Sequence, residues 1–431
     1  MGIREDREAF LRIGMRRKAR DDRRGVALVV VMVVAVAMIA VVASVRTSAP
    51  GPLSSRVSAT TVVIDSTGNV GQYTSLNLFA NGDPQIVYYD VTNLSLKVAS
   101  WNGTGWQLMA PLESTPLGSN DVGSYCSSAV NASDETFVSA LDATTSSLIF
   151  GTSVNNYSEI VDSASQAGYY TSIAVNNYTN TIAISYYDQP NANLRCAVNT
   201  SGTSTWQSVS VDTGGDVGRY SNIVTGYAND SISILYYDFT NGDLKQAISW
   251  GGGPWDKRTL DATGDVGKWP SQAMRGTDWH AAYYDQTNGD LKYMAYVGGI
   301  GNAPVVVDSI GDVGQYASIA INSTGVPFIS YYDATNGDLK LAWNDSGWKN
   351  MTLDSTGDVG QYSSIAIDSN DIVHVSYYDA TNGDLKFISV LSSDLATAIP
   401  EFGSVVLPVA GIVTVVVLIA ALRRGGMGGE E

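Results

Sequence analysis

The sequence repeats one unit seven times, and this repetition constrains the fold more than any other feature. The eleven residues SYYDATNGDLK occur twice without change, at Ser330–Lys340 and Ser376–Lys386. An acidic residue marks the same point in every copy, at intervals of 46 to 52 residues: Asp90, Asp142, Asp188, Asp238, Asp285, Asp333 and Asp379. A unit of this length that cannot bury its own apolar face is stabilised by stacking on its copies.

Each copy contains four segments with the pattern of a β-strand. In the last copies these are Tyr362–Asp368, Val373–Asp379, Leu385–Ser389 and, for the fourth strand, Trp348–Asp354. A Gly-x-aromatic step precedes the first strand in each copy, with the aromatic residue at Tyr73, Tyr125, Tyr170, Tyr220, Trp269, Tyr316 and Tyr362. Patterning of β type at a period near 48 residues predicts the four-stranded blades of a β-propeller.

The ends of the repeat region predict how the ring closes. The seventh copy lacks a fourth strand, whereas an unpaired segment, Thr60–Asp65, precedes the first copy. We therefore predict an all-β, seven-bladed propeller of antiparallel blades over residues 60–390, in which Thr60–Asp65 completes the last blade. Such closure removes an exposed sheet edge.

The repeated motif has a structural explanation. The Asn-Gly pair is expected to supply the positive φ of a tight hairpin, and the leading Asp to accept hydrogen bonds from its own turn. Neighbouring Tyr side chains point to opposite faces of a strand, so both are expected to be buried between blades. These SYYD…NGDLK units resemble propeller repeats of secreted and surface proteins of archaea and bacteria. The resemblance covers residues 60–390 and implies a fold, and it provides no catalytic residues that could be carried over to this chain.

The N-terminal region predicts contact with a membrane. Val26–Val45 is free of charged residues and follows a basic segment, residues 1–25. This pattern is typical of a transmembrane helix with residues 1–25 in the cytoplasm. A signal sequence is the alternative, and a pilin-like leader that is cut after Gly25 is a third. Residues 46–59 would then be a linker.

The C-terminal region has a second apolar span. Pro400-Glu401-Phe402 precedes the span Gly403–Leu422, and Arg423-Arg424 follow it. This order closely resembles the archaeal PEF-CTERM sorting signal, which implies that an archaeosortase removes the span and attaches the protein to the cell surface. An ordinary C-terminal transmembrane helix, with residues 391–402 as a linker and 423–431 as a cytoplasmic tail, is the alternative.

The charge of the repeat region indicates which partners it should repel, and its sequons indicate a cellular location. Residues 51–400 carry 13 Lys and Arg against 34 Asp and Glu, so they should repel nucleic acid. Ten Asn-x-Ser/Thr sequons lie between the two apolar spans and favour an extracellular location. They are the glycosylation candidates Asn93, Asn102, Asn131, Asn156, Asn177, Asn199, Asn229, Asn322, Asn344 and Asn350.

No metal or cofactor site is assigned. Asp354, Asp358, Asp379 and Asp384 lie near glycines, as calcium ligands do, but their spacing differs from that of an EF-hand loop, and turn capping is the favoured explanation. His280 and His374 occupy equivalent positions of nonadjacent blades, so they should not share a metal. Cys126 and Cys196 occupy different positions of the repeat, which disfavours a disulfide.

No catalytic residue is assigned either. Sialidase-like propellers need an arginine cluster, but the arginines of this region fall at unmatched strand positions, and the Asp-box is absent. No Ser/His/Asp or Cys/His arrangement has a supporting motif. Positions that depart from the repeat are candidate ligand contacts: Ala140-Leu141, Trp269-Pro270, Trp279 and Trp250–Trp255. The alternative is that these residues only pack in the core.

These features predict a membrane-anchored, extracellular propeller that binds a surface glycan or a protein and so acts in adhesion. A polysaccharide hydrolase or lyase is the alternative, and it requires two carboxylates with a His or Arg at one mouth of the channel. A passive component of the surface layer is the third reading.

Overall fold

The computed structural model describes residues 59–109, 120–153, 157–163, 166–200, 205–226 and 230–396. Both apolar spans, the Pro-Glu-Phe motif and the charged termini lie outside these residues. Within the part of the chain that is described, no helix has the length and apolar character needed to cross a membrane.

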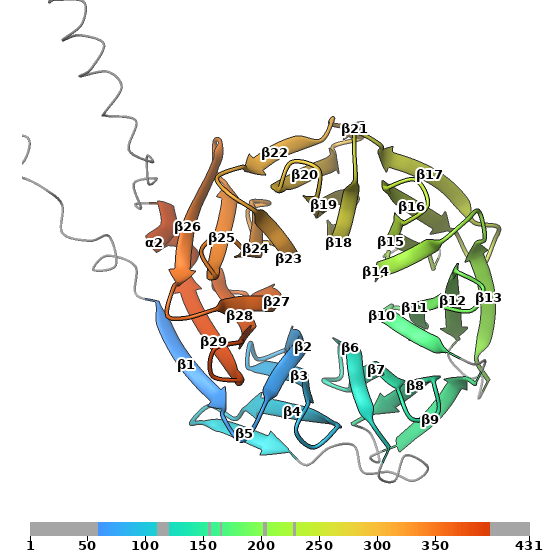
Figure 1. Cartoon of the computed structure of the whole chain (residues 1–431), viewed down its shortest axis with the longest axis horizontal. Helices are drawn as coiled ribbons and strands as arrows, with labels where there is room; N and C mark the ends of the chain where they lie inside the picture. Colours follow the sequence, from blue (N-terminus) through green and yellow to red (C-terminus); the bar gives the residue numbers. More distant parts are fainter. Residues whose placement is uncertain are drawn as a thin grey trace, which may run out of the picture. The chain divides into compact units, whose positions relative to one another are not determined.

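Seven antiparallel sheets are arranged in a ring around a central channel (Figure 1), which confirms the predicted seven-bladed propeller. Sheet 1 contains β2 (Val70–Leu78), β3 (Pro84–Asp90), β4 (Ser95–Trp101) and β5 (Trp106–Met109). Sheet 2 contains β6 (Val122–Val130), β7 (Thr136–Asp142), β8 (Ser147–Thr152) and β9 (Tyr157–Asp162). Sheet 3 contains β10 (Ala167–Val175), β11 (Ile182–Asp188), β12 (Asn193–Asn199) and β13 (Gln207–Asp212).

The remaining sheets follow the same order, with the first strand of each beside the channel. Sheet 4 contains β14 (Val217–Thr225), β15 (Ile232–Asp238), β16 (Asp243–Ser249) and β17 (Asp256–Asp261). Sheet 5 contains β18 (Val266–Arg275), β19 (Asp278–Asp285), β20 (Asp290–Val297), β21 (Ile300–Gly301) and β22 (Val305–Asp308). Sheet 6 contains β23 (Val313–Ile321), β24 (Pro327–Asp333), β25 (Asp338–Asn344) and β26 (Trp348–Asp354).

Sheet 7 closes the ring with the first strand of the domain. It contains β27 (Val359–Ile367), β28 (Ile372–Asp379), β29 (Asp384–Leu391) and β1 (Thr60–Asp65). Strand β1 pairs antiparallel with β29, and Thr60 lies opposite Ser389. The predicted closure is therefore confirmed.

Two details differ from the sequence-based expectation. In sheet 5 the outer position is shared by two short strands, β21 and β22, which both pair with β20. The segment expected to be a linker after residue 390 begins with the end of β29 and a short helix, α2 (Ser392–Ala396). Leu395 of this helix is fully buried against sheets 6 and 7, because an apolar side chain next to an open hydrophobic seam gains by covering it.

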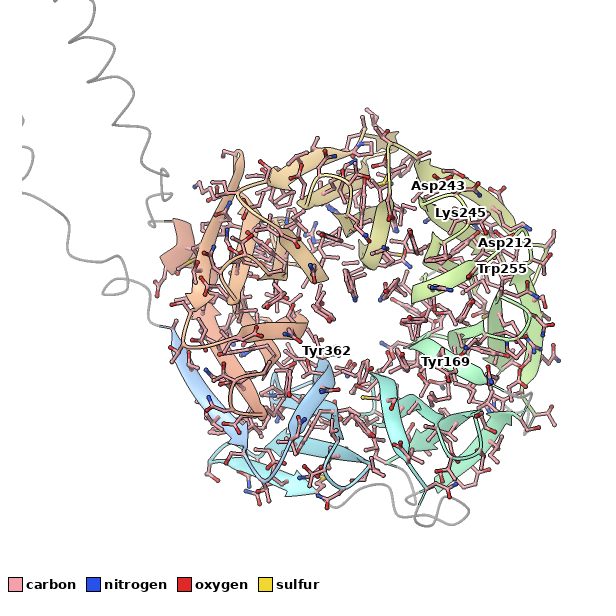
Figure 2. The ribbon with its side chains drawn as sticks, viewed as in Figure 1. Tyr169, Asp212, Asp243, Lys245, Trp255 and Tyr362 are labelled. Atoms are coloured by element: carbon pink, nitrogen blue, oxygen red, sulfur yellow. The ribbon has the colours of Figure 1, made fainter. Side chains whose placement is uncertain are left out.

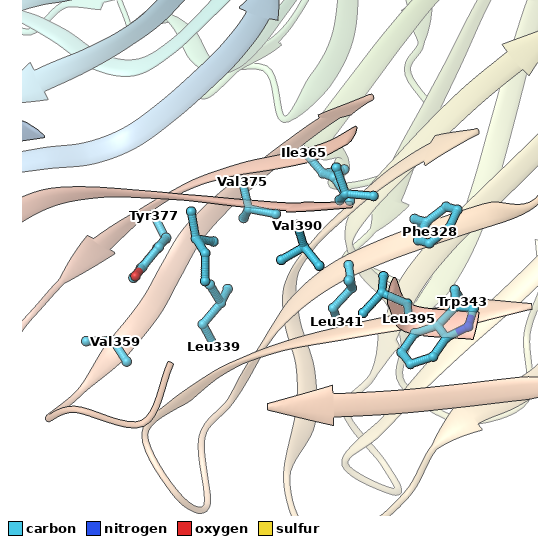
Figure 3. Close-up of a cluster of buried hydrophobic side chains, with 12 residues drawn as sticks. Phe328, Leu339, Leu341, Trp343, Val359, Ile365, Val375, Tyr377, Val390 and Leu395 are labelled. Carbon is cyan, nitrogen blue, oxygen red and sulfur yellow. The ribbon is translucent and has the colours of Figure 1, made fainter. Parts of the chain in front are cut away.

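The core lies between adjacent sheets, with a separate cluster at each interface. Figure 3 shows the cluster between sheets 6 and 7, where Phe328 and Trp343 pack near Val375 and Val390. Both Tyr residues of each YYD motif are buried, on opposite faces of the second strand, as predicted. Each buried aromatic ring removes about 150–250 Å² from water.

Glycine permits the closest contact between sheets. A Cβ atom on Gly360 would lie 2.8 Å from the Cα atom of Leu339 in the preceding sheet, and Gly360 has φ +109°. The equivalent glycine meets a third-strand leucine of the preceding sheet at all seven interfaces. The Gly of the Gly-x-aromatic step is therefore required both by its backbone angle and by lack of space.

The repeated turn is confirmed in part. The Asp379 side chain accepts a hydrogen bond from the backbone N–H of Asn382 at 3.0 Å, as predicted for a capping Asp. Asn382 itself does not adopt a positive φ; only Gly383 does, at +76°. The Gly of the Asn-Gly pair therefore supplies the predicted positive φ alone, in a hairpin loop of four residues between the paired Asp379 and Asp384.

Candidate functional site

The first Tyr of each pair connects neighbouring sheets through an acidic residue. One such connection joins Asp212, at the end of β13, to Lys245 on β16; both residues are labelled in Figure 2. The Tyr236 hydroxyl donates to the same carboxylate at 2.8 Å, and the Lys245 ammonium lies 2.7 Å from it. We call this group a latch. Six interfaces have one, with an Arg for Lys in sheet 3: Asp65/Tyr88/Lys97, Asp162/Tyr186/Arg195, Asp212/Tyr236/Lys245, Asp261/Tyr283/Lys292, Asp308/Tyr331/Lys340 and Asp354/Tyr377/Lys386.

Sheet 2 lacks the Tyr and the cation of the latch. Ala140 and Ile149 occupy their positions and belong to an apolar cluster with Val87 and Val98 of sheet 1. The sequence had marked Ala140-Leu141 as a candidate contact site. The structure assigns both residues to the buried core, so packing explains this departure from the repeat.

The second Tyr of each pair supports the wall of the channel. The Tyr378 hydroxyl donates to Asn69 of the next sheet at 2.8 Å, and the Tyr332 hydroxyl donates to Asp358 at 2.7 Å. The Tyr378 ring also contacts the ring of Tyr362, with centroids 6.2 Å apart. The second Tyr of the repeated motif therefore packs against the aromatic residue of the Gly-x-aromatic step and holds its side chain in place.

Those seven aromatic residues form a closed ring around the channel, one from the inner strand of each sheet. Each contacts both neighbours, and successive ring centroids are 4.6 to 5.1 Å apart. Tyr362, labelled in Figure 2 beside the channel, closes the circle between Tyr316 and Tyr73. We call this group the aromatic ring; its members are Tyr73, Tyr125, Tyr170, Tyr220, Trp269, Tyr316 and Tyr362.

A β-bulge directs each of these side chains toward the channel. Gln361 pairs with Tyr378 and Ser364 with Ser376, so β27 uses three residues where β28 uses two. Tyr362 lies in this bulge at φ +54°, and all seven aromatics have positive φ between 45° and 56°. Such a backbone is strained for a bulky residue by about 1–3 kcal/mol. The strain is compensated by the fixed contacts on both sides of each aromatic side chain.

The aromatic ring borders a hollow of about 350 Å³. Its other lining residues mostly carry small polar groups, among them Thr74, Thr171, Ser221 and Ser363. None of the described residues that line it is acidic, basic or a histidine. The hollow has the volume of a small-molecule site, and its side chains can both donate and accept hydrogen bonds.

The phenols of the aromatic ring are neutral at physiological pH. Burial raises the pKa of Tyr125 to about 12, and burial also raises the pKa of Tyr73, where the neighbouring phenols of Tyr362 and Tyr125 raise it further. Burial likewise raises the pKa of Tyr220 and Tyr316. The site therefore presents hydroxyl groups and aromatic faces without a formal charge.

A second hollow of about 340 Å³ lies further along the inner strands of sheets 1 to 5. Asn77 and Asn176 contribute amides to it, and Val130, Val175 and Met274 contribute apolar surface. Its described lining also lacks carboxylates, basic groups and histidine. Neither hollow has a pair of carboxylates with His or Arg among its described lining residues, whereas the hydrolase or lyase hypothesis places such a group at one mouth of the channel.

Three of the four calcium candidates, Asp354, Asp358 and Asp379, have protein partners. Asp354 and Asp379 both contact Lys386, at 2.5 and 3.8 Å, and Asp358 accepts the Tyr332 hydroxyl. Burial and the nearby Asp379 raise the pKa of Asp384. In the described parts of the chain, no group of three or more His, Cys, Asp or Glu side chains could hold a metal ion.

The histidines and cysteines are buried and lie apart. His280 contacts the Tyr293 hydroxyl at 2.6 Å, whereas His374 contacts Ser389 at 2.9 Å. Cys126 and Cys196 are both free and buried. The Cys126 thiol donates to the carbonyl of Tyr73 at 3.1 Å, next to the aromatic ring.

The sequons differ in exposure. Asn131 and Asn322 are buried, and the amide oxygen of each caps its own turn, which makes them the poorest acceptors for a glycan. Asn156 and Asn229 lie outside the described residues. The other six are half-buried or exposed: Asn93, Asn102, Asn177, Asn199, Asn344 and Asn350.

The marked tryptophans have different environments. Trp269 and Pro270 line the hollow. Trp279 donates to Gln272 at 2.8 Å, Trp255 packs against the core between sheets 3 and 4, and half of Trp250 is exposed. The repetition of the Gly-x-aromatic step was visible in the sequence, but its role in the channel was not predicted, because a bulge directs the side chain.

Comparison with known proteins finds only distant structural likenesses. No protein-family model matches the chain, and no curated protein matches it. Among solved structures, a mutant of AofleA from Arthrobotrys oligospora has a TM-score of 0.46 at 15% identity and covers 70% of this chain and 91% of its own. A mutant of Aleuria aurantia lectin in complex with Fucα1-6GlcNAc has a TM-score of 0.47 at 12% identity, covering 67% and 98%. A Hadza microbial sialidase has a TM-score of 0.43 at 14% identity, covering 76% and 66%. These likenesses are too distant to indicate a ligand.

Proposed function

We propose that this protein is a binding module displayed outside the cell membrane, and that it takes a small, uncharged, hydroxyl-bearing ligand in its channel. One or both apolar spans, Val26–Val45 and Gly403–Leu422, would hold it at the membrane. The observation that carries the proposal is the aromatic ring around a hollow of about 350 Å³ whose described lining is uncharged.

The chemistry of the lining supports this class of ligand. Aromatic faces and hydroxyl groups bind neutral molecules that have both apolar C–H surface and hydroxyl groups, which is the character of a sugar. A charged ligand would lose its hydration without gaining a counter-ion in the hollow. Binding of surface glycans would account for the predicted role in adhesion.

Glycan-array binding by the purified full-length chain in detergent tests the proposal. We expect binding to a neutral glycan and its loss in Ala317→Trp, which fills the hollow from a lining position. Val63→Trp, on the exposed outer strand β1, is the matched control and should bind as the parent does. If the parent chain binds no neutral glycan, the proposal fails and a passive surface-layer role is favoured.

A further inference from the structure

The polarity of the residues that line the hollow differs between sheets, although the sheets around it are near copies. The residue after each member of the aromatic ring carries a hydroxyl or thiol in five sheets: Thr74, Cys126, Thr171, Ser221 and Ser363. In sheets 5 and 6 it is Pro270 and Ala317, which have no polar side-chain atom. With Trp269, the one indole among six phenols, these two residues form what we call the apolar wall.

The same substitutions leave two carbonyl groups without a side-chain donor from this position. In four sheets the side chain donates to the carbonyl of the preceding aromatic residue, as Thr74 does to Tyr362 at 2.8 Å and Ser221 to Tyr170 at 2.9 Å. In sheet 3 the Thr171 hydroxyl donates to Ser139 instead. Pro270 and Ala317 cannot donate in this way. The carbonyls of Tyr220 and Trp269 therefore receive no side-chain hydrogen bond from this position.

A single amide lies at the edge of this wall. The residue two places after the aromatic is Ser in six sheets and Asn222 in sheet 4. The Oδ1 atom of Asn222 accepts the backbone N–H of Gln272 at 3.1 Å, as the serines do for their neighbours. Because this bond fixes the amide, the Nδ2 group of Asn222 is left to donate into the hollow that Asn222 lines.

We propose that the apolar wall and Asn222 form a site for one pyranose ring, with its C–H face on Trp269 and its hydroxyl edge toward the Asn222 Nδ2 group. This inference rests on the proposed function and narrows its ligand class. A pyranose has a rigid apolar face and polar edges, so it matches a lining that is apolar on one side. An acyclic polyol carries the same hydroxyls without that face and should bind more weakly.

The variants that test the site can be taken from the chain's own repeats. Trp269→Tyr combined with Pro270→Thr and Ala317→Thr installs residues that other copies carry at these positions, so the fold should be kept. Asn222→Ser installs the residue of the other six sheets. Trp250→Tyr, at an exposed position outside the hollow, is the control for loss of an indole.

Saturation-transfer NMR and calorimetry would use the full-length chain in detergent, with the methyl glycosides of glucose, galactose, mannose and fucose, and with erythritol as the acyclic probe. We expect at least one glycoside to bind with saturation concentrated on the protons of one ring face. The triple variant should bind it roughly tenfold more weakly, because the phenol of Tyr offers a smaller stacking surface than the indole and the wall becomes polar. Asn222→Ser should bind it roughly fivefold more weakly, from the loss of a hydrogen bond. Trp250→Tyr should be unchanged.

The outcomes separate the two proposals. If no glycoside binds the parent chain, the proposed function fails, and this inference fails with it. If a glycoside binds but the triple variant and Asn222→Ser bind it equally well, the apolar wall does not form the site, while the proposed function stands. Equal binding of erythritol and the glycosides would also overturn the inference. Unfolding midpoints matched to the parent establish that each variant is folded.

Discussion

Removal of one latch carboxylate should destabilise the ring strongly, and Asp354→Ala is the clearest case. The Asp354 side chain accepts the Tyr377 hydroxyl at 2.7 Å and the Lys386 ammonium at 2.5 Å, and it also accepts the backbone N–H of Thr356. After the change, the buried Lys386 keeps only Asp379, at 3.8 Å. Breaking a buried ion pair by removing one partner costs about 3–5 kcal/mol. Because Asp379 offsets part of this, we expect a loss of about 3 kcal/mol.

The assay can be done on the full-length chain in detergent. All nine tryptophans lie between Trp101 and Trp348, so intrinsic fluorescence during urea unfolding follows the propeller alone. Asp345→Ala is the matched control, since Asp345 and Lys349 form a more exposed ion pair, and it should cost no more than about 1 kcal/mol. Equal unfolding free energies for Asp345→Ala and Asp354→Ala would refute the reasoning.

A combined variant separates the cost of an unpaired buried charge from the net contribution of the whole latch to stability. Asp354→Leu with Tyr377→Phe and Lys386→Ile replaces the whole latch by apolar groups, in the manner of Ala140 and Ile149 in sheet 2. Replacing every member of a buried ion pair is often nearly neutral. We therefore expect this triple change to cost less than Asp354→Ala alone; a larger loss would mean that the latch itself supplies net stability.

Three further predictions follow from the packing and the charges. Burial lowers the pKa of His374 below 6.5, so the free energy of unfolding should be highest above pH 6.5 and should fall as the pH drops below that value. The fall should be smaller in His374→Gln, because sheet 1 carries Gln85 at the equivalent position. An unchanged pH profile of stability in the variant would contradict this. Gly360→Ala should cost more than about 2 kcal/mol in urea unfolding because its Cβ would overlap Leu339, whereas Gly105→Ala, with open space around it, should stay within about 0.5 kcal/mol. Chelation with EDTA should leave the melting temperature unchanged, since no group of three or more His, Cys, Asp or Glu side chains in the described residues could hold a metal ion; a fall would indicate a bound cation.

The repeat predicted the fold in detail because all seven copies show the same pattern of strands, so each copy supports the assignment made in the others. The number of sheets, the closure by Thr60–Asp65 and the burial of both tyrosines follow from counting copies and from the alternation of a strand. The sequence also marked Trp269-Pro270 as a departure from the repeat. It could not assign them to the channel, because that placement depends on two register shifts in β18.

The latch was not predicted. The sequence places a Lys after the turn in five copies, but it does not show which Asp each Lys contacts. In the structure Lys386 lies closer to Asp354 of the preceding sheet, at 2.5 Å, than to Asp379 of its own, at 3.8 Å. Contacts between copies depend on how the sheets are rotated against each other, and a single copy contains no information about that rotation.

Closure by β1 also determines how the ring would respond to mechanical force. Thr60 lies opposite Ser389, so the chain enters and leaves the ring at the same end of the β1–β29 pair. Tension between these two points would act across the pair and open its hydrogen bonds one after another, as in unzipping. A pull on the two ends would therefore detach β1 first and turn a closed circle into an open arc.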